Sequence, residues 1–233
     1  RGSPACPRRL AGARGPGSDA GMARGPDFAR EGALIARGAA RVAGLDEAGR
    51  GPLAGPVVAG AVILDPARIP AGIDDSKRLS AAARDRLDRA IRDSAAVALG
   101  VAEPQEIDAL GIAAATFLAM ARALAALPVP PDHALVDGPW LPPGLACPAT
   151  PVVGGDRLSL SVAAASIVAK TWRDRRMVAL AQQHPGYGWE TNRGYGSKSH
   201  IAALHRLGPT PIHRRSFAPL RQMLCPEPAS SEP

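Results

Sequence analysis

Short apolar runs that alternate with longer helical segments constrain the fold of this chain most strongly. Apolar stretches, several rich in valine, predict strands at residues 41–47, 57–64, 95–101, 134–137 and 150–153. Helical spacing and helix-start signals predict helices at residues 81–93, 112–127, 160–182, 198–206 and 212–224. Because helices separate the early strands from the late ones, we expect an α/β fold in which a mixed sheet carries helices on its faces.

The two ends of the chain lack these patterns. Residues 1–40 are rich in Gly, Pro, Ala and Arg, and residues 226–233 are polar and rich in Pro. Such segments cannot bury enough apolar surface to fold, so we predict that both are disordered. The first methionine is Met22, and we hypothesise that translation begins there. The ordered part, residues 41–225, is of ordinary size for one domain.

Composition and charge narrow the class of protein. Hydrophobic residues make up 46% of the chain but aromatic residues only 3%, so the core must consist of Ala, Val, Leu and Ile. The net charge of +7 suggests a polyanionic partner such as nucleic acid, although an arginine-rich proteome would give the same charge. The three scattered cysteines predict neither a zinc knuckle nor a disulfide framework and fit a reducing cytoplasm. No apolar run reaches about 18 residues, so we expect no membrane association.

Carboxylates follow three of the predicted strands. Asp46 and Glu47 end the first, Asp137 ends the fourth, and Asp156 follows the fifth. Adjacent strand residues point to opposite faces, so Asp46 and Glu47 can share a site only if the strand bends or Glu47 reaches round it. An all-oxygen cluster favours Mg²⁺ or Mn²⁺, and two such ions can promote displacement at a phosphodiester. Alternatively, each acid is separately a turn former or a helix cap.

A glycine-rich loop follows the first pair of acids in the run DEAGRGPLAGP. Its GxGxxxG spacing and Pro52 do not match a dinucleotide-binding fingerprint, and the chain has no Walker A motif. Gly49-Arg50-Gly51 would let the backbone approach a ligand closely, although a tight turn between two strands would have the same sequence.

Basic residues recur in the second half of the chain. The long helix at residues 160–182 carries Lys170, Arg173, Arg175 and Arg176. We interpret most of these charges as a solvated face, whereas Lys170 has the better case for a function because of the motif in which it lies. Arg214 and Arg215 are expected to extend this basic surface toward the C-terminus. Trp172 and Trp189 are interpreted as packing residues.

Six ordered motifs between roughly residues 43 and 220 resemble the ribonuclease HII family: GLDEAGRGPLAGPVV, DDSKRLS, LVDG, GGD, SLSVAAASIVAKTWRDRRM and HPGYGWETNRGYGSKSH. The resemblance implies a ribonuclease H-like, mixed five-stranded sheet flanked by helices, with a C-terminal helical extension at about residues 184–225. It also implies an endoribonuclease of DNA replication and repair. Such an enzyme hydrolyses the RNA of RNA–DNA hybrids and nicks on the 5′ side of single ribonucleotides in duplex DNA, leaving 3′-hydroxyl and 5′-phosphate ends.

The resemblance also assigns roles to individual residues. The family's metal-binding, catalytic carboxylates match Asp46, Glu47, Asp137 and Asp156, which implies two Mn²⁺ or Mg²⁺ ions. Asp174, between two arginines, is a rival for the fourth position, although its neighbours suggest a structural ion-pair network.

Substrate contacts are implied in the same way. The family loop that contacts the ribose 2′-hydroxyl matches Gly49, Arg50 and Gly51, and the family's junction-sensing tyrosine matches Tyr195. Expected phosphate contacts come from Lys170, Arg193 and Ser197. Ser76 and Lys77 precede a predicted helix and are expected to contact phosphate through a hydroxyl and a cation, although a solvated approach to a helix capped by Ser80 would have the same sequence. Relatives usually carry Thr at the position of Ser197 and Lys at that of Arg193; the first difference keeps a hydroxyl and the second keeps the charge.

The expected partners are RNA–DNA hybrids and ribonucleotide-containing duplex DNA, with a sliding clamp as a candidate protein partner and a monomeric, cytoplasmic enzyme. Two alternatives stay open. An integrase-like strand transferase on the same fold would cleave an all-DNA duplex. A non-catalytic hybrid-binding module would bind without metal-dependent turnover.

Overall fold

The computed structural model describes residues 25–224. Its strands are β1 (Val42–Ala48), β2 (Val57–Leu64), β3 (Ala95–Ala102), β4 (His133–Asp137) and β5 (Ala149–Val152). Its α-helices are α1 (Ala29–Ile35), α2 (Ala81–Ser94), α3 (Pro104–Leu110), α4 (Ile112–Ala125), α5 (Leu160–Gln183), α6 (Trp189–Asn192), α7 (Lys198–Leu207) and α8 (Ala218–Leu224). A short 3-10 helix, η1 (Gly155–Arg157), follows β5. None of the described helices is both long and apolar enough to cross a bilayer.

The five strands form one sheet in the order β3-β2-β1-β4-β5. β1 and β3 flank β2 in antiparallel fashion, whereas β4 runs parallel to both β1 and β5. This arrangement confirms the predicted mixed, five-stranded sheet, and every strand begins and ends within one residue of its predicted bounds. The parallel pair β1 and β4 brings the carboxyl ends of two distant segments to the same region of the sheet.

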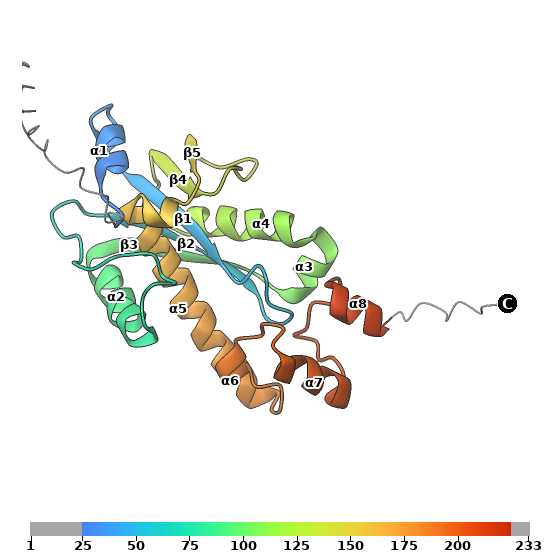
Figure 1. Ribbon diagram of the computed structural model, residues 1–233. Coiled ribbons are helices and arrows are strands. Elements are labelled where there is room, and N and C mark those ends of the chain that lie inside the picture. Colours follow the sequence, from blue (N-terminus) through green and yellow to red (C-terminus); the bar gives the residue numbers. More distant parts are fainter. Residues whose placement is uncertain (1–24, 225–233) are drawn as a thin grey trace, which may run out of the picture.

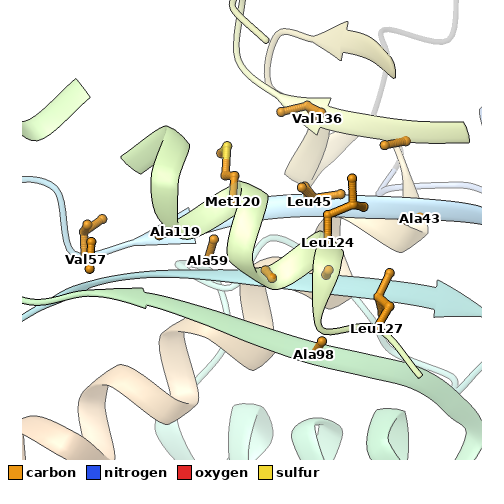
Figure 2. Close-up of a cluster of buried hydrophobic side chains, with 14 of the residues drawn as sticks. Ala43, Leu45, Val57, Ala59, Ala98, Ala119, Met120, Leu124, Leu127 and Val136 are labelled. Atoms are coloured by element: carbon orange, nitrogen blue, oxygen red, sulfur yellow. The ribbon is translucent and has the colours of Figure 1, made fainter. Parts of the chain in front are cut away.

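Helices cover both faces of the sheet (Figure 1), with α4 on one face and α2 and α5 on the other. On the α4 face, Met120 and Leu124 pack above Leu45 and Val136, as Figure 2 shows. Alanine and branched aliphatic residues dominate both clusters, as the low aromatic content predicts.

The long helix α5 lies unusually close to the sheet because small residues face each other there. A Cβ atom placed on Gly44 of β1 would lie 2.1 Å from the backbone carbon of Ser161, and one on Gly60 of β2 would lie 2.5 Å from the Ala165 oxygen. Only hydrogen fits at these two strand positions. The small residues in the first turns of α5 and the two glycines of the sheet therefore set the distance between this helix and the sheet near Asp46.

The prediction of disorder over residues 1–40 is wrong for its last part, since helix α1 lies within it. The carboxylate of Glu31 is fully buried and accepts hydrogen bonds from the Ser159 and Ser161 hydroxyls and from the Ser161 N–H (2.9 Å). This seven-residue helix containing Gly32 is thus held by tertiary contacts rather than by its own propensity. The predictions for residues 1–24, including the Met22 start, and for the tail at 226–233 lie outside the described residues.

Further differences concern helices. Sequence reasoning missed the four-residue helix α6. It also missed α3, although Glu103 and Glu106 form a reciprocal capping box around Pro104 at its first turn. The helix predicted at 212–224 begins only at Ala218. The preceding segment instead bonds to the loop after β1: Arg214 N–H donates to the Leu53 carbonyl (2.8 Å).

Candidate metal centre

Three carboxylates meet where β1 and β4 lie side by side. The register pairs Leu45 with Val136, so the next residues along the two strands are Asp46 and Asp137. One oxygen from each of Asp46, Glu47 and Asp137 lies within 4.8 Å of the others. The structure therefore brings together three of the four acids predicted from the sequence.

Asp46 and Glu47 reach this point from opposite faces of the sheet. Asp46 is on the face of α5, where it shares a cavity with Ser166, whereas Glu47 is on the face of α4. The strand does not end at Glu47 as predicted, because Ala48 is still paired with β2. β4, however, ends at Asp137 and does not pair with β1 beyond Leu45. The edge of β1 is therefore open beside Glu47, and the Glu47 side chain reaches the cluster round this edge.

Burial and mutual repulsion make this cluster electrostatically unfavourable on its own. Asp46 is 4% exposed, and its burial, followed by the charges of Glu47 and Asp137, raises the pKa of its carboxyl well above the ordinary value. Burial also raises the pKa of Glu47, against the opposing charge of Arg50. Burial raises the pKa of Asp137 too, although Gly155 N–H donates to its Oδ1 at 2.7 Å.

The donor set fits a hard divalent cation. All three candidate ligands are carboxylates, and within the described part of the chain no Cys or His joins the group. The one ion pair to these three acids among the described residues is a long contact from Arg50 Nη1 to Glu47 Oε1, at 3.4 Å. Oxygen donors with uncompensated negative charge are the environment that Mg²⁺ and Mn²⁺ prefer.

The fourth predicted acid, Asp156, lies next to the cluster but outside the three-residue group. It is buried in η1, and Lys77 Nζ lies 3.3 Å from its Oδ2. Its negative charge contributes to the raised pKa of Asp137. The rival Asp174 is instead held by Lys170 (2.7 Å) and Arg84 (3.5 Å) on the face of α2 and α5, as expected for a structural ion-pair network.

A cavity of about 420 Å³ opens over Asp46, Glu47 and Asp137. Most of the predicted substrate-contacting residues line it, namely Gly49, Arg50, Gly51, Ser76, Lys77, Lys170 and Tyr195. Two do not. Arg193 faces a neighbouring groove, and the Ser197 hydroxyl caps α7 by accepting from the His200 N–H.

Comparisons with known proteins identify this arrangement. The sequence profile of the family "Ribonuclease HII" matches residues 43–220. This chain belongs to the ribonuclease HII family. It is 57% identical to a ribonuclease HII from Ruegeria pomeroyi over 214 residues, which is 91% of this chain and 92% of that protein.

Solved structures of ribonucleases H2 have the same fold. A ribonuclease H2 from Pyrococcus horikoshii superposes with a TM-score of 0.66 at 29% identity, covering 78% of this chain and 96% of that one. The ribonuclease HII of Archaeoglobus fulgidus, solved as a complex with PCNA, gives a TM-score of 0.66 at 26% identity, covering 76% and 95%. These matches confirm the predicted ribonuclease H-like fold and the family resemblance.

Two buried arginines hold the glycine loop, residues 49–56. The first is Arg214, whose guanidinium is fully buried and donates to three backbone carbonyls, those of Gly49 (2.6 Å), Arg50 (2.9 Å) and Gly55 (2.9 Å). Burial lowers its pKa to about 9. The prediction that Arg214 extends a basic surface is therefore wrong.

Arg173 of α5 is the second, and it too is fully buried rather than part of a solvated face. It donates to the carbonyls of Pro56 (3.0 Å), Ala54 (3.1 Å) and Arg193 (3.1 Å). Burial lowers its pKa to about 10. The last of these bonds ties the glycine loop to the segment that carries Tyr195, so the two predicted substrate-sensing elements share one support.

Two neutral, hydrogen-bonded histidines, His200 and His213, hold the backbone of Tyr195 in place. The Tyr195 carbonyl accepts from His200 Nδ1 (2.8 Å), so Nε2 of that ring carries no proton and accepts from Trp189 Nε1 (3.0 Å). His213 accepts from the Thr210 N–H at Nδ1 (2.9 Å), so its Nε2 donates to His200 Nε2 (3.1 Å). Burial lowers the pKa of both histidines, to about 4 for His213, which keeps this donor sequence intact at neutral pH.

Proposed function

We propose that this chain is a divalent-metal-dependent endoribonuclease that hydrolyses the RNA strand of RNA–DNA hybrids. We also propose that it nicks on the 5′ side of single ribonucleotides in duplex DNA, leaving 3′-hydroxyl and 5′-phosphate ends. The observation that carries the proposal is the meeting of Asp46, Glu47 and Asp137 beneath a cavity lined by Gly49–Gly51. Membership of the ribonuclease HII family supports it.

In this proposal Asp46, Glu47 and Asp137 hold Mg²⁺ or Mn²⁺ with their carboxylate oxygens, and Asp156 joins them as a fourth ligand. When bound, a pair of such ions supplies an activated water and stabilises the departing 3′-oxygen. Asp156 is supported as a ligand by its buried position next to Asp137. In the described structure its charge is balanced by Lys77.

The remaining residues of the cavity position the substrate. The backbone of Gly49–Gly51 can approach the ribose 2′-hydroxyl, the group that distinguishes RNA from DNA. The Tyr195 ring, 45% exposed, lies beside this loop: a Cβ atom on Gly51 would be 3.7 Å from its edge. Ser76, Lys77 and Lys170 line the same cavity and are proposed phosphate contacts.

Some predictions gain less support from the geometry. Arg193 and Ser197 would contact phosphates only beyond the cavity, in a longer duplex. A sliding clamp is a proposed partner because a related enzyme was solved in complex with PCNA. The monomeric state and the cytoplasmic location stay predictions.

Nick mapping tests the proposed reaction. The substrate is a DNA duplex with one ribonucleotide, incubated with Mg²⁺, Mn²⁺ or EDTA. We expect a nick 5′ of the ribonucleotide with either ion and none in EDTA. Asp137→Asn should abolish the nick while the duplex still binds. The matched control is Asp132→Asn, an exposed acid just before β4, which should cut normally.

The same assay separates the alternatives. Cleavage of an all-DNA duplex would favour a strand transferase, and binding without metal-dependent turnover would favour a non-catalytic module. The fourth ligand is decided by comparing Asp156→Asn, expected to lose most activity, with Asp174→Asn. Full activity of Asp156→Asn would remove that residue from the metal site.

A further inference from the structure

We propose that Trp140 forms a nucleotide subsite next to the carboxylates. It would take the nucleotide that flanks the scissile phosphate on the side away from Tyr195. The inference rests on the proposed function, because it names a residue that contacts the same substrate strand next to the scissile phosphate. No motif in the sequence singled out this residue.

A second, smaller cavity of about 140 Å³ lies beside the first. It shares Glu47, Arg50 and Asp137 with the larger cavity, but Trp140 and Phe117 replace Tyr195 among its lining residues. The three shared residues therefore lie between two aromatic side chains. A strand whose phosphate sits at the carboxylates would extend toward Tyr195 in one direction and toward Trp140 in the other.

Trp140 differs from an ordinary exposed side chain in where it is anchored. Single exposed apolar residues are common on protein surfaces and need no explanation. Trp140, however, is 73% exposed, the highest value among the large hydrophobic side chains of the described residues, and it follows Asp137 by three positions. Gly138 makes the turn between them with φ of 94°, and its N–H donates to the Val152 carbonyl at 3.0 Å. Pro139 then restricts the backbone just before the indole.

The chemistry of the second cavity fits a nucleotide. Its aromatic wall can pack against the apolar face of a sugar in the duplex backbone. The Arg50 side chain, 53% exposed, offers a guanidinium to a phosphate at the boundary between the two cavities. The acidic end of the second cavity, formed by Glu47 and Asp137, lies at the proposed point of cleavage. A purely apolar partner would leave these charges facing it unpaired.

Duplex binding tests the subsite directly. The probe is a fluorescein-labelled DNA duplex with one ribonucleotide, titrated in EDTA so that no cleavage occurs. Burying about 50–100 Å² of indole surface against a nucleotide, at about 25 cal/mol per Å², is worth about 1.3–2.5 kcal/mol, so Trp140→Ala should raise Kd by about 10- to 70-fold. Trp140→Phe should keep most of the affinity, since it keeps a ring. The control Val153→Ala removes another exposed side chain, 70% exposed and outside both cavities, and should not change Kd.

The tryptophan fluorescence of the protein provides a second readout. Trp189 is buried and Trp172 half-buried, so a change in emission on binding should come mainly from Trp140 and disappear in Trp140→Phe. Two shortened duplexes, each ending at the ribonucleotide on a different side, locate the contact. Wild type and Trp140→Ala should bind equally to the duplex that lacks the nucleotides on the side away from Tyr195.

An unchanged Kd for Trp140→Ala would overturn the subsite. This failure is distinct from failure of the proposed function, which would appear as the absence of nicking by the wild-type protein in Mn²⁺. Because the Trp140 side chain lies outside the core, its truncation should leave the melting temperature unchanged, so a weaker Kd cannot be attributed to unfolding.

Discussion

Replacing Arg214 by lysine tests whether the glycine loop is held by the geometry of a guanidinium rather than by its charge. The guanidinium makes three hydrogen bonds, to the carbonyls of Gly49, Arg50 and Gly55. A lysine keeps the positive charge, but its single nitrogen can satisfy at most about one of these diverging acceptors. Two hydrogen bonds from a charged donor, each worth about 1.5–3 kcal/mol, would be lost. The expected loss of stability is therefore about 3–6 kcal/mol, a large part of the roughly 5–15 kcal/mol that stabilises a typical domain.

Equilibrium unfolding in urea measures this loss. The matched control is Arg215→Lys, because Arg215 is the next residue and is exposed, and it should shift the free energy of unfolding by less than about 0.5 kcal/mol. We also expect Arg214→Lys to cut ribonucleotide-containing duplex more slowly under conditions where it is folded, since the displaced loop carries Gly49–Gly51. Equal urea midpoints for the two variants, with unchanged dependence on denaturant, would refute the reasoning.

Three further predictions concern packing, charge and pH. Gly44→Ala should destabilise the fold by about 1–3 kcal/mol or more, because the new Cβ atom meets the Ser161 backbone. The control Gly32→Ala in α1 meets no neighbouring atom and should be neutral or stabilising. Urea unfolding of both variants measures the difference in their free energies of unfolding. Asp46→Asn should raise the melting temperature of the metal-free protein, by about 2–4 °C for each kcal/mol of relieved repulsion. A melting temperature below that of the wild type would contradict the raised pKa of the Asp46 carboxyl. The pKa of His213 is lowered to about 4, so between pH 6.5 and 4 only the unfolded state takes up its proton. The contribution of His213 to stability should therefore fall with decreasing pH in this window, by up to about 1.4 kcal/mol per unit, and oppose the gain from the carboxyls whose pKa values are raised. His213→Phe removes this contribution, so the difference in unfolding free energy between wild type and His213→Phe should shift by up to that amount per pH unit, and a difference that is constant from pH 6.5 to 4 would contradict it.

Much of the fold and of the candidate metal site could be predicted from the sequence because both depend on local patterns. Strands β1 and β4 are apolar runs that end near carboxylates, and parallel neighbours must bring those ends together. Asp46 and Glu47 were therefore recognisable as a site before any coordinates. Sequence reasoning left two ways for Glu47 to join this site, a bent strand or a side chain that reaches round it. The choice between them depends on where β4 stops pairing while β1 continues, which the sequence does not show.

The supporting residues could not be predicted, because their roles depend on contacts between distant segments. An arginine has the same sequence signature whether it is solvated or buried, and Arg214 reaches Gly49 across 165 positions. Glu31 is similarly fixed by Ser161, 130 residues away, so the helix that carries it shows no strong signal of its own. Trp140 stood in a loop without helical or strand periodicity, and only its position against the carboxylates gives it meaning.

Binding of Mn²⁺, followed by titration calorimetry, tests most directly whether the clustered carboxylates form a metal centre. We predict that the wild-type protein binds Mn²⁺ and that the affinity weakens as the pH falls, because the ligands must lose protons whose pKa values are raised. Asp137→Asn should lose this binding. An affinity for Mn²⁺ that is the same in both proteins would contradict the account.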